Sequence, residues 1–348
     1  MLLEQQVPLA PLTTLHLGGP ARRLLTVSSP RELVEAVADA DAAAEPLLVL
    51  GGGSNVVVPD EGFAGTVVLI RTSEASTLRD GSGVVRLFVQ AGAPWDGVVA
   101  HTVSEGLSGL ECLSGIPGST GATPIQNVGA YGQEVAETIT AVGAYDRAER
   151  QVVRLTPPDL RFTYRHSILK GVDRYVVLDV TFALTPERLS RPIRYAELAQ
   201  ALGTEIGARV PLDDARAAVL SLRRRKGMVI DPGDPDTASV GSFFTNPVLG
   251  VGDFDALAAR AKATPPHWPM ADGQVKASAA WLIERAGFAK GYGNGQVGIS
   301  TKHTLALTNR GGGTTAQLLS LAREIRDGVR TAYGVELTPE PVLLGAEL

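Results

Sequence analysis

The chain has 348 residues, of which 44% are hydrophobic and 20% charged, and its net charge is −5. Because single cores usually divide beyond ~250 to 300 residues, we expect a globular protein of two or three domains. The acidic balance argues against a general nucleic-acid binder. The apolar runs are all shorter than the ~20 residues that a membrane helix needs, so we expect no membrane span.

Cysteine and histidine usage excludes further classes. The one cysteine, Cys112, cannot form an internal disulfide. Five histidines without an HExxH or CxxC motif offer little from which to build a zinc site, so we expect no metal. The N-terminal MLLEQQVPLAP lacks the basic flank and long apolar core of a signal peptide, which predicts a cytoplasmic protein.

The first predicted elements are a helix, a strand and a glycine loop. Ser29, Pro30 and Glu32 fit the start of a helix over residues 30–44. A buried-strand pattern at 46–50 then leads into GGGSN, residues 51–55. Such a loop lets backbone N–H groups reach a phosphate. Since strand-like residues follow instead of a helix, a phosphate here is held by loop amides and hydroxyls, and an ordinary glycine turn is the alternative.

The rest of the first half is rich in strands. Helical spacing begins at Trp95, and residues 139–155 have the pattern of a hairpin around Asp146 and Arg147. The segment 107–132 is a glycine-rich loop, whose length inside a compact domain is unusual unless it is functional. Together these patterns predict an α+β first half. Further strands are predicted at residues 66–70, 84–92 and 174–184.

The second half is more helical. Asp213 can cap a helix that ends at Gly227, and DPGDPD at 231–236 is a loop. Apolar stripes predict helices over 276–286 and 315–333. The helix that Asp213 can cap ends in a basic run. We expect this run to be a solvated face, and binding of an acidic substrate is the functional alternative. The run comprises Arg223, Arg224, Arg225 and Lys226.

Two motifs invite a chemical interpretation. Residues 293–298 are a literal GxGxxG, but a helix precedes them and a strand-like segment follows, whereas the dinucleotide fingerprint needs strand, loop and then helix; we therefore predict a turn. The second is GSFFTNP, residues 241–247. Ser242 lies in no GxSxG elbow and has no histidine nearby in sequence, so a loop residue and a proton donor both remain open.

A resemblance decides between these alternatives. Taken together, the motifs resemble the UDP-N-acetylenolpyruvoylglucosamine reductases (MurB, type I) of bacterial peptidoglycan synthesis, and they occur in order over nearly the whole chain. They are LTTLHLGG at 12–19, GGGSNVVV at 51–58, IPGSTGATPIQNVGAYG at 116–132, YRHS at 164–167, GSFFTNP at 241–247 and TPEPVLLG at 338–345.

The resemblance implies an α+β flavoprotein of the vanillyl-alcohol-oxidase (PCMH-type) class. Two FAD-binding subdomains, 1–75 and 76–212, precede a C-terminal α+β substrate domain, 213–334, and the tail 335–348 is expected to return to the first subdomain. NADPH reduces non-covalent FAD, and the enolpyruvyl group of UDP-N-acetylglucosamine enolpyruvate is reduced to UDP-N-acetylmuramate. We expect a monomeric cytoplasmic enzyme.

The same resemblance assigns catalytic roles. Arg165 matches the arginine that meets the substrate carboxylate and enolate, for which a planar guanidinium is suited. Glu340 matches the glutamate that assists the same intermediate, with Glu336 as a weaker competitor, and Ser242 matches the proton donor.

Binding residues also carry over. For the substrate they are Tyr164, Tyr195, Lys226, Asn246 and Lys276, of which Tyr195 is the mobile tyrosine. For FAD they are Gly51, Gly52, Gly53, Ser54 and Asn55 at the pyrophosphate, with Ser114, Gly115, Gly118, Gly121, Ile125, Gln126, Asn127 and Gly129 along the isoalloxazine and adenosine path.

The remaining residues receive structural roles or none. Phe243 and Phe244 are expected to pack and fix Ser242, and Trp281 and the stripe Leu318–Ala332 to belong to the core. His303 is assigned no role. The rival hypotheses are another FAD-dependent oxidase or dehydrogenase of the superfamily, which often tethers FAD through histidine, and a non-catalytic nucleotide-sugar sensor.

Overall fold

The computed structural model describes residues 1–79, 81, 83–270 and 273–348. The chain divides into two compact units, and each is built from several segments. The first comprises Met1–Val7, Ala21–Gly53 and Phe63–Arg225. The second comprises Pro8–Pro20, Ser54–Gly62 and Lys226–Leu348.

One sheet of the first unit has the strand order β1-β2-β5-β3, with β5 parallel to both β2 and β3. The helix α1 (Pro30–Ala42) packs against β5 and β3. It begins as predicted, because Ser29 Oγ accepts a hydrogen bond from the Glu32 N–H at 3.2 Å. The strands are β1 (Leu2–Pro8), β2 (Pro20–Val27), β3 (Leu47–Leu50) and β5 (Phe63–Ile70).

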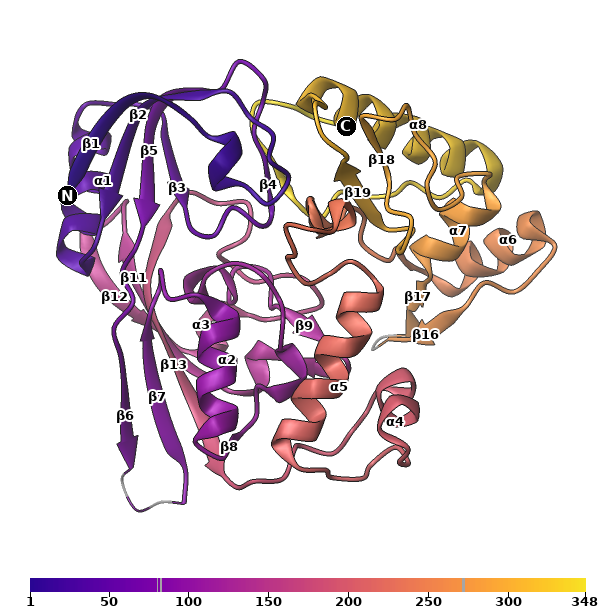
Figure 1. Ribbon diagram of the computed structural model, residues 1–348, viewed down its shortest axis with the longest axis horizontal. Coiled ribbons are helices and arrows are strands. Elements are labelled where there is room, and N and C mark those ends of the chain that lie inside the picture. The colour runs from indigo at the N-terminus through magenta and orange to yellow at the C-terminus, as the bar shows by residue number, and fades with distance from the viewer. Residues whose placement is uncertain (80, 82, 271–272) are drawn as a thin grey trace. The chain divides into compact units, whose positions relative to one another are not determined.

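The other sheet of this unit is antiparallel, in the order β12-β11-β13-β7-β6, and β13 runs through its middle (Figure 1). The predicted hairpin around Asp146 and Arg147 is confirmed as the turn between β11 and β12. The strands are β6 (Ala75–Arg79), β7 (Val85–Gln90), β11 (Ile139–Asp146), β12 (Gln151–Leu155) and β13 (Tyr175–Pro186), with β8 (Leu107–Ser108) paired to the end of β13.

Helices α2 (Trp95–Ser104) and α5 (Leu212–Arg225) contact each other beside this sheet (Figure 1). Asp213 lies in the first turn of α5, so its prediction as the cap was wrong; the helix begins one residue earlier. The smaller elements are α3 (Pro157–Leu160), α4 (Ala196–Leu202), β9 (Gly129–Ala130), β10 (Gln133–Glu134) and the 3₁₀ turns Glu111–Leu113, Thr120–Ala122 and Val135–Glu137.

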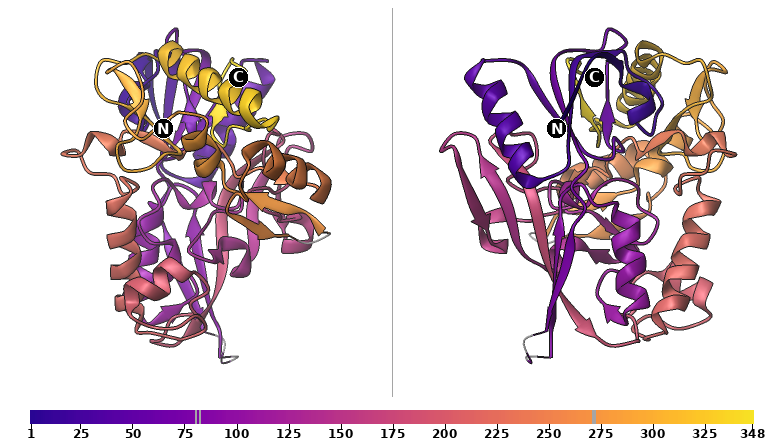
Figure 2. Two further views of the ribbon diagram at one scale, coloured as in Figure 1. Left: turned by 90° about the vertical axis from the view of Figure 1, so that its right-hand side faces the viewer. Right: turned by 60° about the vertical axis from the view of Figure 1, so that its left-hand side comes forward.

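In the second unit, α8 (Thr315–Tyr333) is the long yellow helix of Figure 2 and packs on an antiparallel sheet. Its apolar stripe is confirmed as core up to Val329, whereas Ala332 is exposed and Tyr333 is buried in its place. Gly334, at φ +72°, ends the helix. The sheet has the order β14-β19-β18: β14 (Ser239–Ser242), β19 (Ala306–Asn309) and β18 (Val297–Ile299).

The rest of this unit surrounds that core. The GxGxxG segment is a turn, as predicted: Gly293 bridges to Gly298, which already lies in β18. Helix α7 (Ala279–Arg285) starts later than residue 276, because Val275–Ala277 form β17. The remaining elements are the 3₁₀ turns Ala10–Leu12 and Pro235–Thr237, β4 (Val56–Val57), β15 (Val248–Leu249), α6 (Val251–Ala261), β16 (His267–Pro269) and β20 (Val342–Leu343).

No helix in the described part of the chain combines the length and the apolar character needed to cross a bilayer.

Candidate active site

Two glycine loops predicted to bind FAD meet in the first unit, although more than 60 residues separate them. Gly51 and Gly52 follow β3, and a Cβ on Gly52 would lie 2.6 Å from Gly118 Cα, while one on Gly51 would collide with Ser119 Oγ. Position 52 therefore requires glycine for this close approach of two backbones, whereas a side chain at position 51 would displace the Ser119 hydroxyl. The result is a surface of exposed backbone from two chain segments, which suits contact with a phosphate or a ring edge.

The segment 113–121 is held against the start of α2 and the end of β7. Trp95 donates from its backbone N–H to Gly118 O at 3.0 Å and from its indole Nε1 to Leu113 O at 3.2 Å. Gly121 packs so tightly that a Cβ there would lie 2.5 Å from Ala91 Cβ. Its N–H donates to Ala91 O at 2.8 Å. The backbone of the predicted loop is therefore held by specific hydrogen bonds, and its regular elements are short strands and 3₁₀ turns.

Asn127 fixes the next predicted FAD segment through its side chain. It is buried, and its φ of +45° is a left-handed conformation that asparagine tolerates. Its Nδ2 donates to Glu134 Oε2 at 2.8 Å and to Thr163 O at 3.1 Å, while its Oδ1 accepts from the Ala136 N–H at 3.2 Å. Asn127 thus joins the segment 125–129 to the segment that carries Arg165.

Arg165 lies directly beside that segment. Its Nη2 donates to Gly129 O at 2.9 Å, and its own carbonyl accepts from Lys170 Nζ at 3.1 Å. The side chain is partly buried, and its φ of +52° is left-handed. Non-glycine residues held in this region cost free energy and concentrate at functional sites. One predicted catalytic residue is therefore anchored to the predicted FAD path.

Tyr195, predicted to close over the substrate, packs edge-to-face on Tyr131, with ring centroids 5.5 Å apart. It is 38% exposed and stands at the start of α4. Burial raises the pKa of both phenols, that of Tyr131 to about 12. Both hydroxyls therefore keep their protons at neutral pH and can donate hydrogen bonds.

The expectation of a solvated basic face was wrong for Arg223. Arg224 and Arg225 are exposed, but Arg223 is partly buried, and burial lowers its pKa to about 10. Tyr131 and Asp96 act to raise this pKa, and Arg165 acts to lower it. A signal was present in the sequence, because Arg223 continues the buried positions 215 and 219 of α5 at intervals of four residues.

The other two predicted catalytic residues lie together in the second unit. Ser242 ends β14 opposite Ala306, and the following Phe243 and Phe244 are fully buried, with rings 5.2 Å apart, as expected of packing residues. The Glu340 N–H donates to Phe243 O at 2.8 Å. Glu340 is thereby fixed to the residue that follows Ser242, just beyond the end of β14.

Asn55 has a different neighbourhood from Gly51 and Gly52, and it belongs to the second unit. Its carbonyl accepts from the Val342 N–H at 3.0 Å, which begins the parallel pairing of β4 with β20. Its Nδ2 points to Glu340 O at 3.5 Å, a long hydrogen bond. Predicted as an FAD contact, Asn55 also supports the segment that carries Glu340.

The predicted nucleotide contacts Asn246 and Lys276 lie near β15 and β17. Asn246 Oδ1 accepts from the Ala279 N–H at 3.0 Å, at the start of α7. Lys276 pairs with Val248 across the strands, and its Nζ lies 5.7 Å from the centroid of the Trp268 ring, which is 43% exposed. A cation over an aromatic face is a favourable arrangement. Lys226 is the first residue of this unit's long segment.

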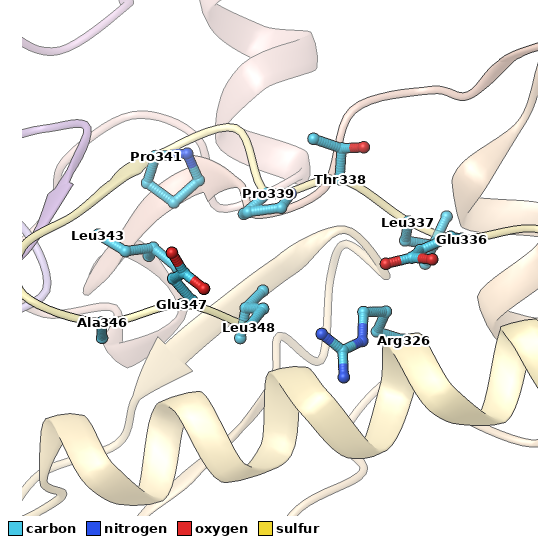
Figure 3. A pocket seen from close by; sticks show the side chains of 10 residues that line it. All are labelled: Arg326, Glu336, Leu337, Thr338, Pro339, Pro341, Leu343, Ala346, Glu347 and Leu348. Atoms are coloured by element: carbon cyan, nitrogen blue, oxygen red, sulfur yellow. The ribbon is translucent and has the colours of Figure 1, made fainter. Parts of the chain in front are cut away.

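A cavity of about 350 Å³ lies between α8 and the C-terminal tail (Figure 3). Pro339 and Pro341, on either side of Glu340, line it together with Arg326 of α8. Among the described residues, the lining includes Glu336, the weaker candidate for the assisting glutamate, but none of the residues to which a catalytic or binding role was assigned. We therefore assign it no chemistry.

The glycines predicted to bind FAD in the first unit have a geometry that suits the cofactor. A Cβ on Gly51 or Gly52 would enter the space between these loops, and Gly53, Gly115 and Gly118 have φ of +63°, +72° and +115°. Loop amides that need glycine for their conformation are suited to hold a pyrophosphate without a helix dipole.

Comparisons with known proteins agree with this geometry. Residues 21–156 match a family described as FAD binding domain, and residues 234–344 match the C-terminal domain of UDP-N-acetylenolpyruvoylglucosamine reductase. The reductase of Thermobifida fusca is 59% identical over 99% of this chain and 98% of its own length. That of Mycolicibacterium smegmatis is 52% identical over 99% and 96%.

A solved structure agrees as well. That of UDP-N-acetylenolpyruvylglucosamine reductase (MurB) from Thermus caldophilus matches with a TM-score of 0.67 and 26% identity, covering 99% of both chains. The predicted FAD-binding fold with a C-terminal α+β domain is confirmed. The chain therefore belongs to the UDP-N-acetylenolpyruvoylglucosamine reductase family of flavin-dependent oxidoreductases.

Proposed function

We propose that the protein catalyses the NADPH-dependent reduction of the enolpyruvyl group of UDP-N-acetylglucosamine enolpyruvate to UDP-N-acetylmuramate. It acts as a cytoplasmic monomer in peptidoglycan synthesis. The reaction consumes one hydride, which comes from NADPH, and one proton. FAD, when bound, supplies the hydride to the substrate. Family membership supports the reaction class, and the hydrogen bond from Glu340 to Phe243, beside Ser242, is the observation that carries the catalytic assignment.

Arg165 is proposed to bind the substrate carboxylate. Hydride addition to the terminal vinyl carbon breaks the π bond of the C=C group and leaves its electron pair on the carbon next to that carboxylate. A permanently charged, planar guanidinium stabilises such charge because it can hold two oxygens at once. The bond from Nη2 to Gly129 O orients the guanidinium for this role.

Ser242 is proposed to deliver the proton to the same carbon from its hydroxyl. A serine hydroxyl is a weak acid, so it needs a group that favours the transfer, and Glu340 is the proposed partner. The backbone bond between Glu340 and Phe243 fixes the spacing of the two residues without involving their side chains. A correctly placed general acid contributes roughly 10²- to 10⁴-fold in rate.

The binding residues are proposed as assigned from the sequence. For FAD these are Gly51–Asn55, Ser114, Gly115, Gly118, Gly121, Ile125, Gln126, Asn127 and Gly129. For the substrate they are Tyr164, Tyr195, Lys226, Asn246 and Lys276. We also propose the division into FAD-binding subdomains 1–75 and 76–212 and a substrate domain 213–334, with the tail 335–348 belonging to the first.

Steady-state NADPH oxidation by flavin-replete protein tests the proposal. The rate should depend on UDP-N-acetylglucosamine enolpyruvate. A rate that does not depend on this substrate would refute the reductase assignment. Acid denaturation separates the rival oxidases, because non-covalent FAD is released into solution, whereas a histidine-tethered flavin stays with the precipitate.

A further inference from the structure

The start of α2 holds the segment 113–118 at several points. Besides the two hydrogen bonds from Trp95, Asp96 Oδ1 accepts from the Gly115 N–H at 2.6 Å. Gly115 is buried and has a φ of +72°, so its backbone conformation is one that few other residues would adopt. Of these three hydrogen bonds, the one to Asp96 has a charged acceptor. Charge-assisted hydrogen bonds are about twice as strong as neutral ones.

Asp96 is itself held by α5. Arg216 donates from Nη1 to Asp96 Oδ1 at 2.7 Å and from Nη2 to Oδ2 at 2.9 Å, so the two planar groups meet in a fork. The Arg216 side chain is 17% exposed and that of Asp96 is 41% exposed. The Oδ1 atom therefore joins α5 and Gly115 at a single point.

The electrostatics of Asp96 agree with this arrangement. Burial opposes its ionisation, but the hydrogen bonds from Arg216 and the Gly115 N–H outweigh burial and lower its pKa. Arg223 acts in the same direction. Asp96 is therefore a carboxylate at neutral pH and accepts from both donors.

We propose that Asp96 is a positioning residue for FAD: through the Gly115 N–H it fixes the loop 114–118 in its flavin-binding conformation, and Arg216 fixes Asp96. The inference rests on the proposed placement of this loop along the FAD. A loop that is ordered beforehand binds more tightly, because binding then does not bear the cost of ordering it.

The test compares variants of the FAD-loaded protein. Asp96→Ala removes both contacts, Asp96→Asn keeps an oxygen acceptor without the charge, and Arg216→Met removes the anchor of Asp96. The measurement is the FAD dissociation constant, from flavin fluorescence on dilution, together with the flavin absorption spectrum. The matched control is Asp41→Asn, because Arg147 forms a similar forked ion pair with Asp41, at 2.6 to 3.2 Å, between α1 and the β11–β12 turn.

Asp96→Ala should raise the FAD dissociation constant at least tenfold and shift the flavin spectrum. The dissociation constant of Asp96→Asn should lie between those of the parent protein and Asp96→Ala. Adding Arg216→Met to Asp96→Ala should raise the FAD dissociation constant less than twofold further, because both side chains act through the contact of Asp96 with Gly115. Asp41→Asn should leave both readouts unchanged while lowering the unfolding temperature. A dissociation constant within twofold of the parent for Asp96→Ala would overturn the inference. If Asp96→Ala does not fold, the same criterion applies to Asp96→Asn.

This outcome is independent of the reductase assignment. If the parent protein oxidises NADPH with the enolpyruvyl substrate but the Asp96 variants keep their FAD, the inference fails and the proposed function stands. If the variants lose FAD but the parent protein does not act on that substrate, the inference stands and the proposed substrate is wrong.

Discussion

The backbone N–H of Glu340 donates a hydrogen bond to the carbonyl oxygen of Phe243, with the two atoms 2.8 Å apart. The bond joins residues that are nearly a hundred positions apart and is flanked by others: Thr245 N–H donates to Thr338 O at 3.0 Å, and Phe244 forms a bridge with Pro339. The strand end carrying Ser242 and the tail carrying Glu340 are therefore one structural unit, and their relative position is fixed by backbone.

Replacing Ser242 by alanine should separate the two half-reactions. NADPH should still bleach the flavin at near the normal rate, because no proton to substrate carbon is needed there. Reoxidation by the enolpyruvyl substrate should slow by roughly 10²- to 10⁴-fold, the usual contribution of a general acid. Stopped-flow absorbance of the flavin measures both rates. Ser76→Ala, an exposed serine of β6, is the control. Survival of both half-reactions in Ser242→Ala would leave the serine only a loop residue.

Replacing Arg165 by lysine should keep the charge but lose the planar fork. A hydrogen bond to a charged group contributes about 1.5 to 3 kcal/mol, so kcat/KM for the enolpyruvyl substrate should fall roughly 10- to 100-fold. Arg161→Lys is the matched control, since Arg161 is exposed in the same segment and has a similar φ of +47°. Equal kcat/KM values for the two variants would argue against a role of Arg165 in carboxylate binding.

The variant Val342→Pro tests whether the pairing of β20 with β4 positions Glu340. Val342→Pro removes the N–H that donates to Asn55 O, which should displace the tail and slow flavin reoxidation by substrate at least tenfold. FAD content should not change. Val342→Ala keeps the N–H and alters only a side chain that is 51% exposed, so it should behave like the parent protein. A normal reoxidation rate in the proline variant would show that this pairing does not position Glu340.

The Asp146–Arg174 pair predicts a dependence of stability on pH. Hydrogen bonds from Arg174 lower the pKa of Asp146 below its ordinary value of 3.8, and the Ala148 and Glu149 N–H groups add to this. Because the folded state binds this proton less readily than the unfolded state, the stabilisation is present above about pH 3.8 and is lost as pH falls further.

Asp146→Asn should therefore lower the free energy of unfolding at pH 7, and the difference from the parent should shrink below pH 4. Urea unfolding at a series of pH values measures it. A difference that stays constant down to pH 2.5 would refute the assignment.

Cys112 should be chemically inert in the native protein. Burial, followed by the charges of Glu111 and Glu137, raises the pKa of its thiol to about 12, so almost no thiolate exists at pH 8. Iodoacetamide should therefore leave the folded protein unmodified and add one label in urea, as read by mass spectrometry. Rapid labelling of the folded protein would contradict the burial of this residue.

The sequence predicted the elements whose signals are local. The stripe of α8 and the strand before Gly51 were found because periodicity and caps lie within the element itself. The burial of Arg223 was missed, because its charge outweighed a spacing of four residues from the buried positions 215 and 219. The Asp96–Arg216 pair joins residues 120 positions apart, and a local sequence pattern does not predict such a contact. The roles of Arg165, Ser242 and Glu340 come from motif resemblance and stay predictions.

In the proposed reaction, the bound flavin is oxidised by the enolpyruvyl group of a UDP-sugar. The direct measurement is an anaerobic single turnover, in which protein whose flavin has been reduced with one equivalent of NADPH is mixed with UDP-N-acetylglucosamine enolpyruvate. We predict return of the oxidised flavin spectrum and a product heavier than the substrate by two hydrogens, identified by mass spectrometry as UDP-N-acetylmuramate. Flavin that stays reduced, with the substrate recovered unchanged, would contradict the account.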